Sequence, residues 1–127
     1  MSIRRHSSGS TFEAEIGYSR AVADDLYLHI SGTTGYDYST MQISADVAAQ
    51  AEQCMLNIEA VLLAHQVPWD NVVRVRYILP NPDDFEPCWP VLKKYFAGAP
   101  PAATMISAGL ADPSMKIEIE LTARLSE

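Results

Sequence analysis

Apolar and charged residues alternate close to the end of the chain. Successive side chains of a β-strand point to opposite faces, so this alternation predicts a strand with one apolar face and one face that carries two carboxylates. The apolar face is expected to hold Ile117, Ile119 and Leu121, and the opposite face Glu118 and Glu120. Carboxylates are seldom buried without a chemical reason, so we look for function on this strand.

Further stretches of the chain have the composition of strands. Two of them flank Asp24-Asp25, an acidic pair suited to a tight turn, and this arrangement predicts a hairpin. A partly alternating stretch before the hairpin is expected to be an edge strand. The expected additional strands are residues 12–20, 21–23, 26–31, 72–79 and 104–107.

Gly32-Thr33-Thr34-Gly35 is expected to end the strand that precedes it. One interpretation is a turn that needs glycine at positive φ. The other is a cradle of backbone N–H groups for a phosphate or a carboxylate. Residues 36–42 are expected to form a polar loop.

Arg74 and Arg76 share one face of the strand expected over residues 72–79. They could be exposed charges at a sheet edge, or they could line a subunit interface or an anion pocket. The opposite face is expected to hold Val73, Val75, Tyr77 and Leu79.

Steps of three and four between apolar residues predict a helix from Ser44 to about His65. Ser44 is the expected N-cap, and Asp46 suits the positive end of the helix dipole. Pro68 cannot continue a helix, so the helix is expected to end before Val67.

A second, shorter helix is expected within residues 81–96. Two prolines disturb its first half, which predicts an irregular or 3₁₀ opening at residues 83–86 and a regular helix from about Cys88 or Trp89. Gly98 is the expected stop.

The expected order is therefore β-β-β-α-β-α-β-β, which is typical of an α+β fold. We expect one mixed six-stranded sheet with both helices on one face. A length of 127 residues fits a single domain, so residues 1–127 are treated as one domain.

The composition excludes several functional classes. The formal net charge is −7, and no dense cluster of Lys and Arg is present, which argues against a general nucleic-acid binder. No apolar run approaches the ~20 residues of a membrane span, and nothing resembles a signal peptide, so we expect a cytoplasmic protein. Cys54 and Cys88 are expected to be small core residues, and the three histidines show no metal-binding spacing.

Five motifs follow one another along the chain: Gly17-Tyr18-Ser19-Arg20-Ala21-Val22, His29-Ile30-Ser31-Gly32-Thr33-Thr34-Gly35, Asn57-Ile58-Glu59-Ala60-Val61-Leu62, Pro101-Ala102-Ala103-Thr104-Met105 and Lys116-Ile117-Glu118-Ile119-Glu120. In this order and spacing they resemble the RidA/YjgF/YER057c/UK114 family, which is also labelled endoribonuclease L-PSP-like or putative translation initiation inhibitor-like. The resemblance covers about residues 12–125.

This resemblance implies a chorismate-mutase-like fold and a homotrimer whose sheets form a central barrel. It also implies that small molecules bind in clefts between subunits, without a metal or an organic cofactor. Active members of the family hydrolyse reactive enamines and imines, such as 2-aminoacrylate, to keto acids and ammonia. The expected function is therefore an imine or enamine deaminase.

The family pattern also suggests which residues form the site. Glu118 matches the acid that handles the water, and the resemblance thereby assigns it the catalytic role. The corresponding substrate-binding positions are Tyr18, Ser31, Gly32, Ala103, Thr104 and Met105. From the residues alone, Glu118 could equally be a solvated or interface salt-bridge residue. Tyr18 and Ser31 could simply pack in a cleft and support a turn.

Ala103 departs from the family pattern, because the resemblance places there the arginine that holds the substrate carboxylate. A guanidinium binds a carboxylate through two charge-assisted hydrogen bonds, and losing both could cost ~10²-fold in affinity. Arg20, Arg74 or Arg76 could replace it. The alternatives are altered substrate preference, or a non-catalytic small-molecule binding protein of the same family. RNA cleavage has no support from the residues.

Overall fold

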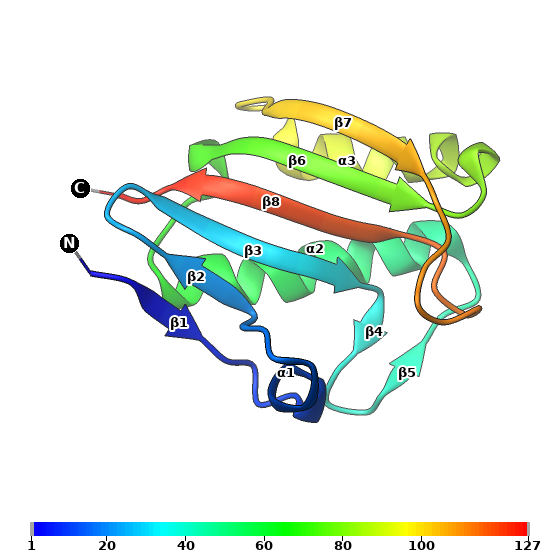
Figure 1. Cartoon of the computed structure of the whole chain (residues 1–127). Coiled ribbons are helices and arrows are strands. Elements are labelled where there is room, and N and C mark those ends of the chain that lie inside the picture. Colours follow the sequence, from blue (N-terminus) through cyan, green and yellow to red (C-terminus); the bar gives the residue numbers. More distant parts are fainter. Residues whose placement is uncertain (1, 127) are drawn as a thin grey trace.

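The computed structural model describes residues 2–126, which form one six-stranded sheet with helices packed on one side (Figure 1). The sheet is mixed, because β6 and β7 are parallel and the other pairs are antiparallel. The strand order across the sheet is β1 (Arg4–His6), β2 (Ala21–Ala23), β3 (Tyr27–Thr34), β8 (Glu118–Arg124), β6 (Val72–Leu79) and β7 (Ala102–Ser107).

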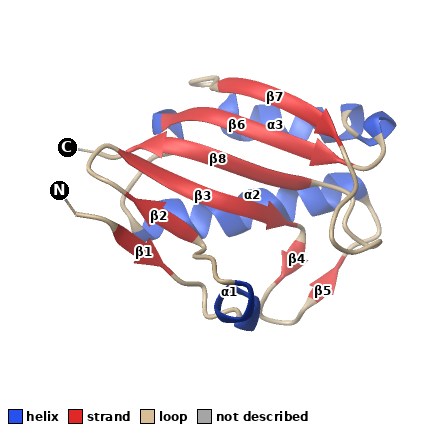
Figure 2. Cartoon of the chain, viewed as in Figure 1, coloured by secondary structure: helices blue, strands red, loops and turns tan. Residues whose placement is uncertain are grey.

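Two helices, α2 (Val47–Ala64) and α3 (Trp89–Phe96), cover the same face of the sheet (Figure 2). The core lies between these helices and the sheet, and it includes the buried thiols of Cys54 and Cys88. The α+β class, the six-stranded mixed sheet and the placement of both helices on one face are therefore confirmed. None of the helices in residues 2–126 has the length and apolar character needed to cross a bilayer.

Strand β8 lies in the middle of the sheet, between β3 and β6. Ile117, just before the strand, and Ile119 and Leu121 within it are buried on the helix side. Glu118 and Glu120 lie on the opposite face and are only partly buried. The alternation predicted from the sequence is confirmed.

The predicted edge strand over residues 12–20 is wrong. Residues Thr11–Ile16 form the short helix α1, and the edge strand is β1, earlier in the chain. Ser10 caps α1 by accepting a hydrogen bond from the backbone N–H of Phe12, and Gly17 ends it at φ 95°. Caps at both ends stabilise a short helix, whereas Phe12 and Ile16 are exposed and offer no buried face to a strand.

Three further boundaries differ from the sequence expectation. Gly32 is not in a turn, because β3 runs on to Thr34. The polar loop of residues 36–42 carries a small ladder between β4 (Tyr36–Asp37) and β5 (Gln42–Ile43). Helix α2 is capped by Asp46, whose carboxylate accepts from the N–H of Ala49 at 2.9 Å, and not by Ser44.

The face prediction for β6 is partly wrong. Val75, Tyr77 and Leu79 are buried as expected, but Val73 is exposed. The register between β6 and β8 shifts between Val72 and Arg74, so Val72 takes the buried position. The irregular opening before α3 is confirmed, since 3₁₀ turns at Pro82–Asp84 and Glu86–Cys88 precede a helix that starts at Trp89.

Gln50, fully buried on α2, connects the helix to the segment just before it and to the loop that precedes β8. Its amide nitrogen donates to the carbonyls of Ser44 at 2.7 Å and Ser114 at 2.9 Å. Its amide oxygen accepts from the N–H of Lys116 at 2.9 Å. Gly35 lies against it, and a Cβ at Gly35 would come within 2.6 Å of the Gln50 Cβ. Gln50 thus fixes the chain two residues before Glu118.

We expect Gln50→Met to lower the free energy of unfolding by about 2–4 kcal/mol, because it leaves two carbonyls and one N–H without a partner inside the protein. Urea denaturation followed by circular dichroism measures this change. Gln53→Met is the control, since Gln53 is partly exposed and bonds only Asn57, and it should cost less than about 1 kcal/mol. Equal losses in both variants would contradict the role assigned to Gln50.

Candidate functional site

Glu118 lies where β8 passes the irregular end of β3. The register between these strands shifts between Ile30 and Thr33, so Ser31 and Gly32 bulge out of the regular ladder. A Cβ at Gly32 would lie 2.8 Å from both Cδ and Oε2 of Glu118. Glycine at this position is therefore what allows the carboxylate to sit against the backbone of β3.

Tyr18 is positioned by the C-terminal cap of α1. The N–H groups of Gly17 and Tyr18 both donate to the carbonyl of Glu13, at 2.9 and 3.0 Å. Positive φ at Gly17 makes this reversal possible. The Tyr18 ring then lies 6.0 Å from the guanidinium carbon of Arg20.

Ser31 and Arg20 face each other across β3 and the start of β2. The N–H of Ser31 donates to the Arg20 carbonyl at 3.0 Å, and its hydroxyl donates to the Ser19 carbonyl at 2.6 Å. The Arg20 side chain is 6% exposed, and its Nη2 donates to the Gly32 carbonyl at 2.6 Å. We call Tyr18, Arg20, Ser31, Gly32 and Glu118 the Glu118 site.

Burial raises the pKa of Glu118, and the neighbouring Glu120 carboxylate raises this pKa further. The positive charge of Arg20 opposes both effects. A carboxyl group with a raised pKa can be present in both protonation states nearer to neutral pH, which is what a general acid–base residue requires. The Glu118 site therefore holds a group suited to proton transfer.

The other predicted site residues lie elsewhere in the chain. Ala103, Thr104 and Met105 are on β7, at the far edge of the sheet. Strands β8 and β6 separate β7 from β3, a distance of about 14 Å across three strand spacings. A single chain therefore does not bring these residues to Ser31 and Gly32. Glu118 on β8 is also separated from β7 by β6, and Ala103 is level with Leu121 and not with Glu118.

The residues of β7 also differ in the face they occupy. Ala103 and Met105 pair with Val75 and Tyr77, so they point to the side of the sheet that carries the helices, where Met105 packs against the core. Thr104 pairs with Arg76 and lies on the opposite side. The alanine at position 103 is thus on neither the strand nor the face that holds Glu118.

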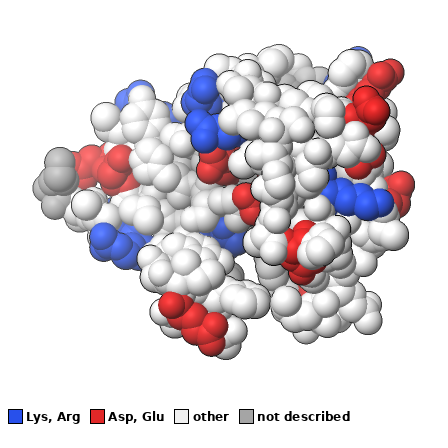
Figure 3. Space-filling view, turned by 45° about the vertical axis from the view of Figure 1, so that its right-hand side comes forward, with Lys and Arg blue, Asp and Glu red and all other residues white. Residues whose placement is uncertain are grey.

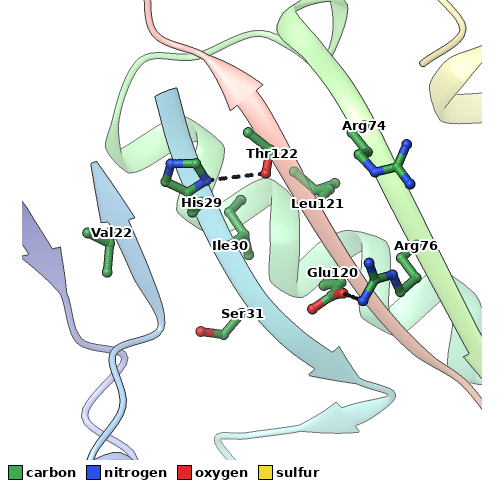
Figure 4. Close-up of a pocket in the computed structure, with 9 residues that line it drawn as sticks. All are labelled: Val22, His29, Ile30, Ser31, Arg74, Arg76, Glu120, Leu121 and Thr122. Carbon is green, nitrogen blue, oxygen red and sulfur yellow. Dashed lines mark hydrogen bonds and ion pairs between the residues drawn. The ribbon is translucent and has the colours of Figure 1, made fainter. Parts of the chain in front are cut away.

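The face of the sheet opposite α2 and α3, here called the bare face, contains a hollow of about 350 Å³, shown in Figure 4. Arg76 forms an ion pair with Glu120 at 2.9 Å, and Nη2 of Arg74 donates to the Thr104 hydroxyl at 3.2 Å. Both arginines therefore line this hollow and are not simply exposed charges at a sheet edge. The residues that line it are Val22, His29, Ile30, Ser31, Arg74, Arg76, Glu120, Leu121 and Thr122.

Figure 3 shows how charges are distributed on one face of the molecule. On the face shown in Figure 3, basic and acidic atoms are interspersed and do not form one basic band. Within residues 2–126, no three side chains among His, Cys, Asp and Glu converge as metal ligands would.

Comparisons with known proteins show which family the chain belongs to. Residues 8–125 match the sequence model of the family Endoribonuclease L-PSP. The chain belongs to the RidA/YjgF family. Its α+β architecture is that of the family, as a Mycobacterium tuberculosis protein described as a member of the YjgF/YER057c/UK114 family superposes with a TM-score of 0.88, at 30% identity, over 98% of this chain and 100% of that one.

Two relatives illustrate the range within the family. The human 2-iminobutanoate/2-iminopropanoate deaminase is 34% identical over 123 residues, which cover 95% of this chain and 90% of the relative. Protein DfrA of Myxococcus xanthus is 37% identical over 109 residues, which cover 84% of this chain and 83% of the relative. The family therefore includes proteins named as imine deaminases.

The raised pKa of Glu118 makes a prediction about stability. Between the glutamate pKa of the unfolded chain, about 4.3, and the higher pKa in the folded protein, the folded state binds more protons than the unfolded state. The contribution of Glu118 to stability is therefore complete below this window and is lost as the pH rises through it. Glu118→Gln should raise Tm relative to wild type at about pH 7.5, and by less at about pH 4.

Differential scanning calorimetry at both pH values measures the difference. The control is Glu15→Gln on α1, where the carboxylate is exposed and has no hydrogen-bond partner within residues 2–126. This control should shift Tm little at either pH. A gain for Glu118→Gln that is larger at the acidic pH would contradict the assignment.

Proposed function

We propose that the protein is a hydrolase that deaminates small reactive imines or enamines, with Glu118 as the catalytic residue. The observation that carries the proposal is the Glu118 carboxyl group, partly buried against Gly32 with a raised pKa. Membership of a family that includes proteins named as 2-iminobutanoate/2-iminopropanoate deaminases supports the type of reaction.

In the proposed reaction, the Glu118 carboxylate accepts a proton from water while the water oxygen bonds to the carbon of a protonated imine. Glu118 then returns this proton to the nitrogen of the resulting amino alcohol. The C–N bond breaks as the C=O bond forms, so nitrogen leaves as ammonia, which then takes the former hydroxyl proton and becomes ammonium. An enamine joins this route by taking a proton on carbon. No metal or organic cofactor is needed to balance these steps.

Substrate preference is proposed to differ from that of relatives with arginine at the position of Ala103. An alanine methyl group cannot form the charge-assisted hydrogen bonds with which a guanidinium holds a carboxylate. In a relative with arginine at this position, these bonds would favour substrates that carry a carboxylate. Ala103 cannot favour such substrates in this way. Ligand selection here then falls to the other residues of the site.

We further propose that three copies assemble through the bare faces of their sheets and complete the ligand cleft between subunits. Two observations support this assembly. Within residues 2–126, strands β1 and β7 have no further strand paired at their outer edges, and no helix covers the face of the sheet opposite α2 and α3. A neighbouring copy could bring its β7, with Ala103, Thr104 and Met105, to the Glu118 site. A small molecule, and not a nucleic acid, is the proposed ligand.

We expect ammonia release from 2-aminoacrylate, generated in the assay, to exceed the rate in buffer. Glu118→Gln should lower kcat/KM by about 10²–10⁴-fold, because general acid–base catalysis contributes that much. Glu15→Gln is the control, since Glu15 is exposed on α1 and lies outside the Glu118 site, and it should keep the activity.

Two results would overturn the catalytic proposal. One is a wild-type rate equal to that in buffer for 2-aminoacrylate and for neutral cyclic imines. The other is an unchanged rate in Glu118→Gln. The non-catalytic alternative, for which the alanine at position 103 is the supporting observation, would then apply if a metabolite still raised Tm at saturation.

Size-exclusion chromatography with light scattering should give about 42 kDa, three times the 14.0 kDa of one chain. Ile106→Lys should reduce this mass, because Ile106 is 39% exposed on the bare side of β7 and would place a charge in the interface. Leu63→Lys is the control, as Leu63 is 70% exposed on α2. A wild-type mass near 14 kDa would contradict the trimer.

A further inference from the structure

We propose that Arg20 binds the anionic group of the ligand in the Glu118 site, and that this group is the carboxylate of a small 2-imino or 2-oxo acid. The inference rests on the proposed function for the location of the ligand. Ala103 cannot hold a carboxylate by charge, and the inference assigns this contact to Arg20, which lies just before β2.

Arg20 is held firmly in place by its backbone. Its N–H donates to the His6 carbonyl at 2.8 Å, and its carbonyl accepts from Ser31 at 3.0 Å. The side chain is 6% exposed. It is therefore a buried cation at a fixed position between β1 and β3, and not a mobile surface charge.

The hydrogen-bonding capacity of this guanidinium is largely unused. Of its five N–H donors, Nη2 uses one on the Gly32 carbonyl at 2.6 Å. Nε is enclosed and has no partner within residues 2–126. Nη1 also makes no hydrogen bond to any described residue, but unlike Nε it is not fully buried. One neutral carbonyl does not require a guanidinium, because an amide side chain could donate the same bond.

The charge of Arg20 is not neutralised at close range. Within residues 2–126, no carboxylate oxygen lies within 4.0 Å of its nitrogens. Glu13 and Glu118 interact with it only over longer distances. Glu13 is occupied by the N–H and hydroxyl of Ser8. A buried charge without a partner is costly, and a bound carboxylate would compensate it.

The other two arginines on this side of the sheet are in different situations. Arg76 is already paired with Glu120 at 2.9 Å. Arg74 is exposed to water and donates to Thr104. Arg20 alone among the three combines burial with the lack of a close anion in the described chain. Burial matters because charge-assisted hydrogen bonds are stronger where water is excluded.

The position of Arg20 also suits the proposed reaction. Gly32 lies beside both functional groups, since its carbonyl accepts from Arg20 and the Glu118 carboxylate occupies the space where a Cβ at this position would be. In a 2-imino acid, the carboxylate is bonded directly to the carbon that water attacks. A carboxylate held by Arg20 would therefore keep the C=N carbon on the side of Glu118.

The test uses 2-oxobutanoate, a stable 2-oxo acid, and its neutral methyl ester, with isothermal titration calorimetry on the full-length protein. Wild type should bind the acid more tightly than the ester. Arg20→Gln keeps a donor for the Gly32 carbonyl, and it should weaken binding of the acid by about 10- to 100-fold and change binding of the ester little. Arg20→Lys should restore part of the affinity. Arg124→Gln, at the end of β8, is the control and should bind like wild type.

A second readout does not depend on any variant folding. The Nε–H resonance of Arg20 in a ¹⁵N correlation spectrum should shift when wild-type protein is titrated with 2-oxobutanoate, and should not shift with the ester. The proposal is overturned if the acid leaves this resonance unchanged. It is also overturned if folded Arg20→Gln binds the acid as wild type does, or if Arg74→Gln loses the acid where Arg20→Gln does not.

These outcomes separate this inference from the proposed function. Deamination of imines without any preference for a carboxylate would preserve the function and exclude the role of Arg20. Binding of 2-oxobutanoate through Arg20 without any deamination would exclude the function and leave the anion site in place.

Discussion

The contact between the Glu118 carboxylate and the backbone of Gly32 is the constraint on which the site depends. Core packing of Ile117 and Ile119 forces the side chain between them to the bare face of the sheet. A side chain on the facing residue of β3 would collide with the carboxylate there. The register shift in β3 and the glycine within it resolve this conflict, at the cost of partly burying a charge.

The same contact connects the site to the rest of the fold. The Gln50 amide accepts a hydrogen bond from the N–H of Lys116, so helix α2 fixes where β8 begins. The position of Glu118 relative to the residues of β3 is thereby fixed as well. From the other side, the Gly32 carbonyl holds the Arg20 guanidinium, which belongs to the start of β2. A helix and three strands therefore define the position of one carboxylate and one cation. Such rigidity suits proton transfer, which requires groups held within hydrogen-bond reach of the reacting atoms.

The sequence predicts the parts of this structure that depend on periodicity. The alternation around Glu118 and the apolar stripe of α2 each follow from the way side chains meet a core. Helix α1 escaped prediction because it is short, its apolar residues are exposed, and its caps at Ser10 and Gly17 determine it. Similarly, Asp46 and Ser44 are both good N-caps, and only the observed hydrogen bond to Ala49 distinguishes them.

The site was harder to predict, because it depends on which strands are neighbours. The resemblance assigns Ala103 and Glu118 to one site, yet β6 lies between the strands that carry them, and both β8 and β6 lie between β7 and β3. Nor does any local pattern show that Arg20 is buried, since its partner is a backbone carbonyl twelve residues away. The fold thus separates the motif on β7 from the motifs that meet around Gly32. Glu118 and Arg20 both lie at Gly32, so the identity of residue 103 on β7 leaves the relation between them unchanged.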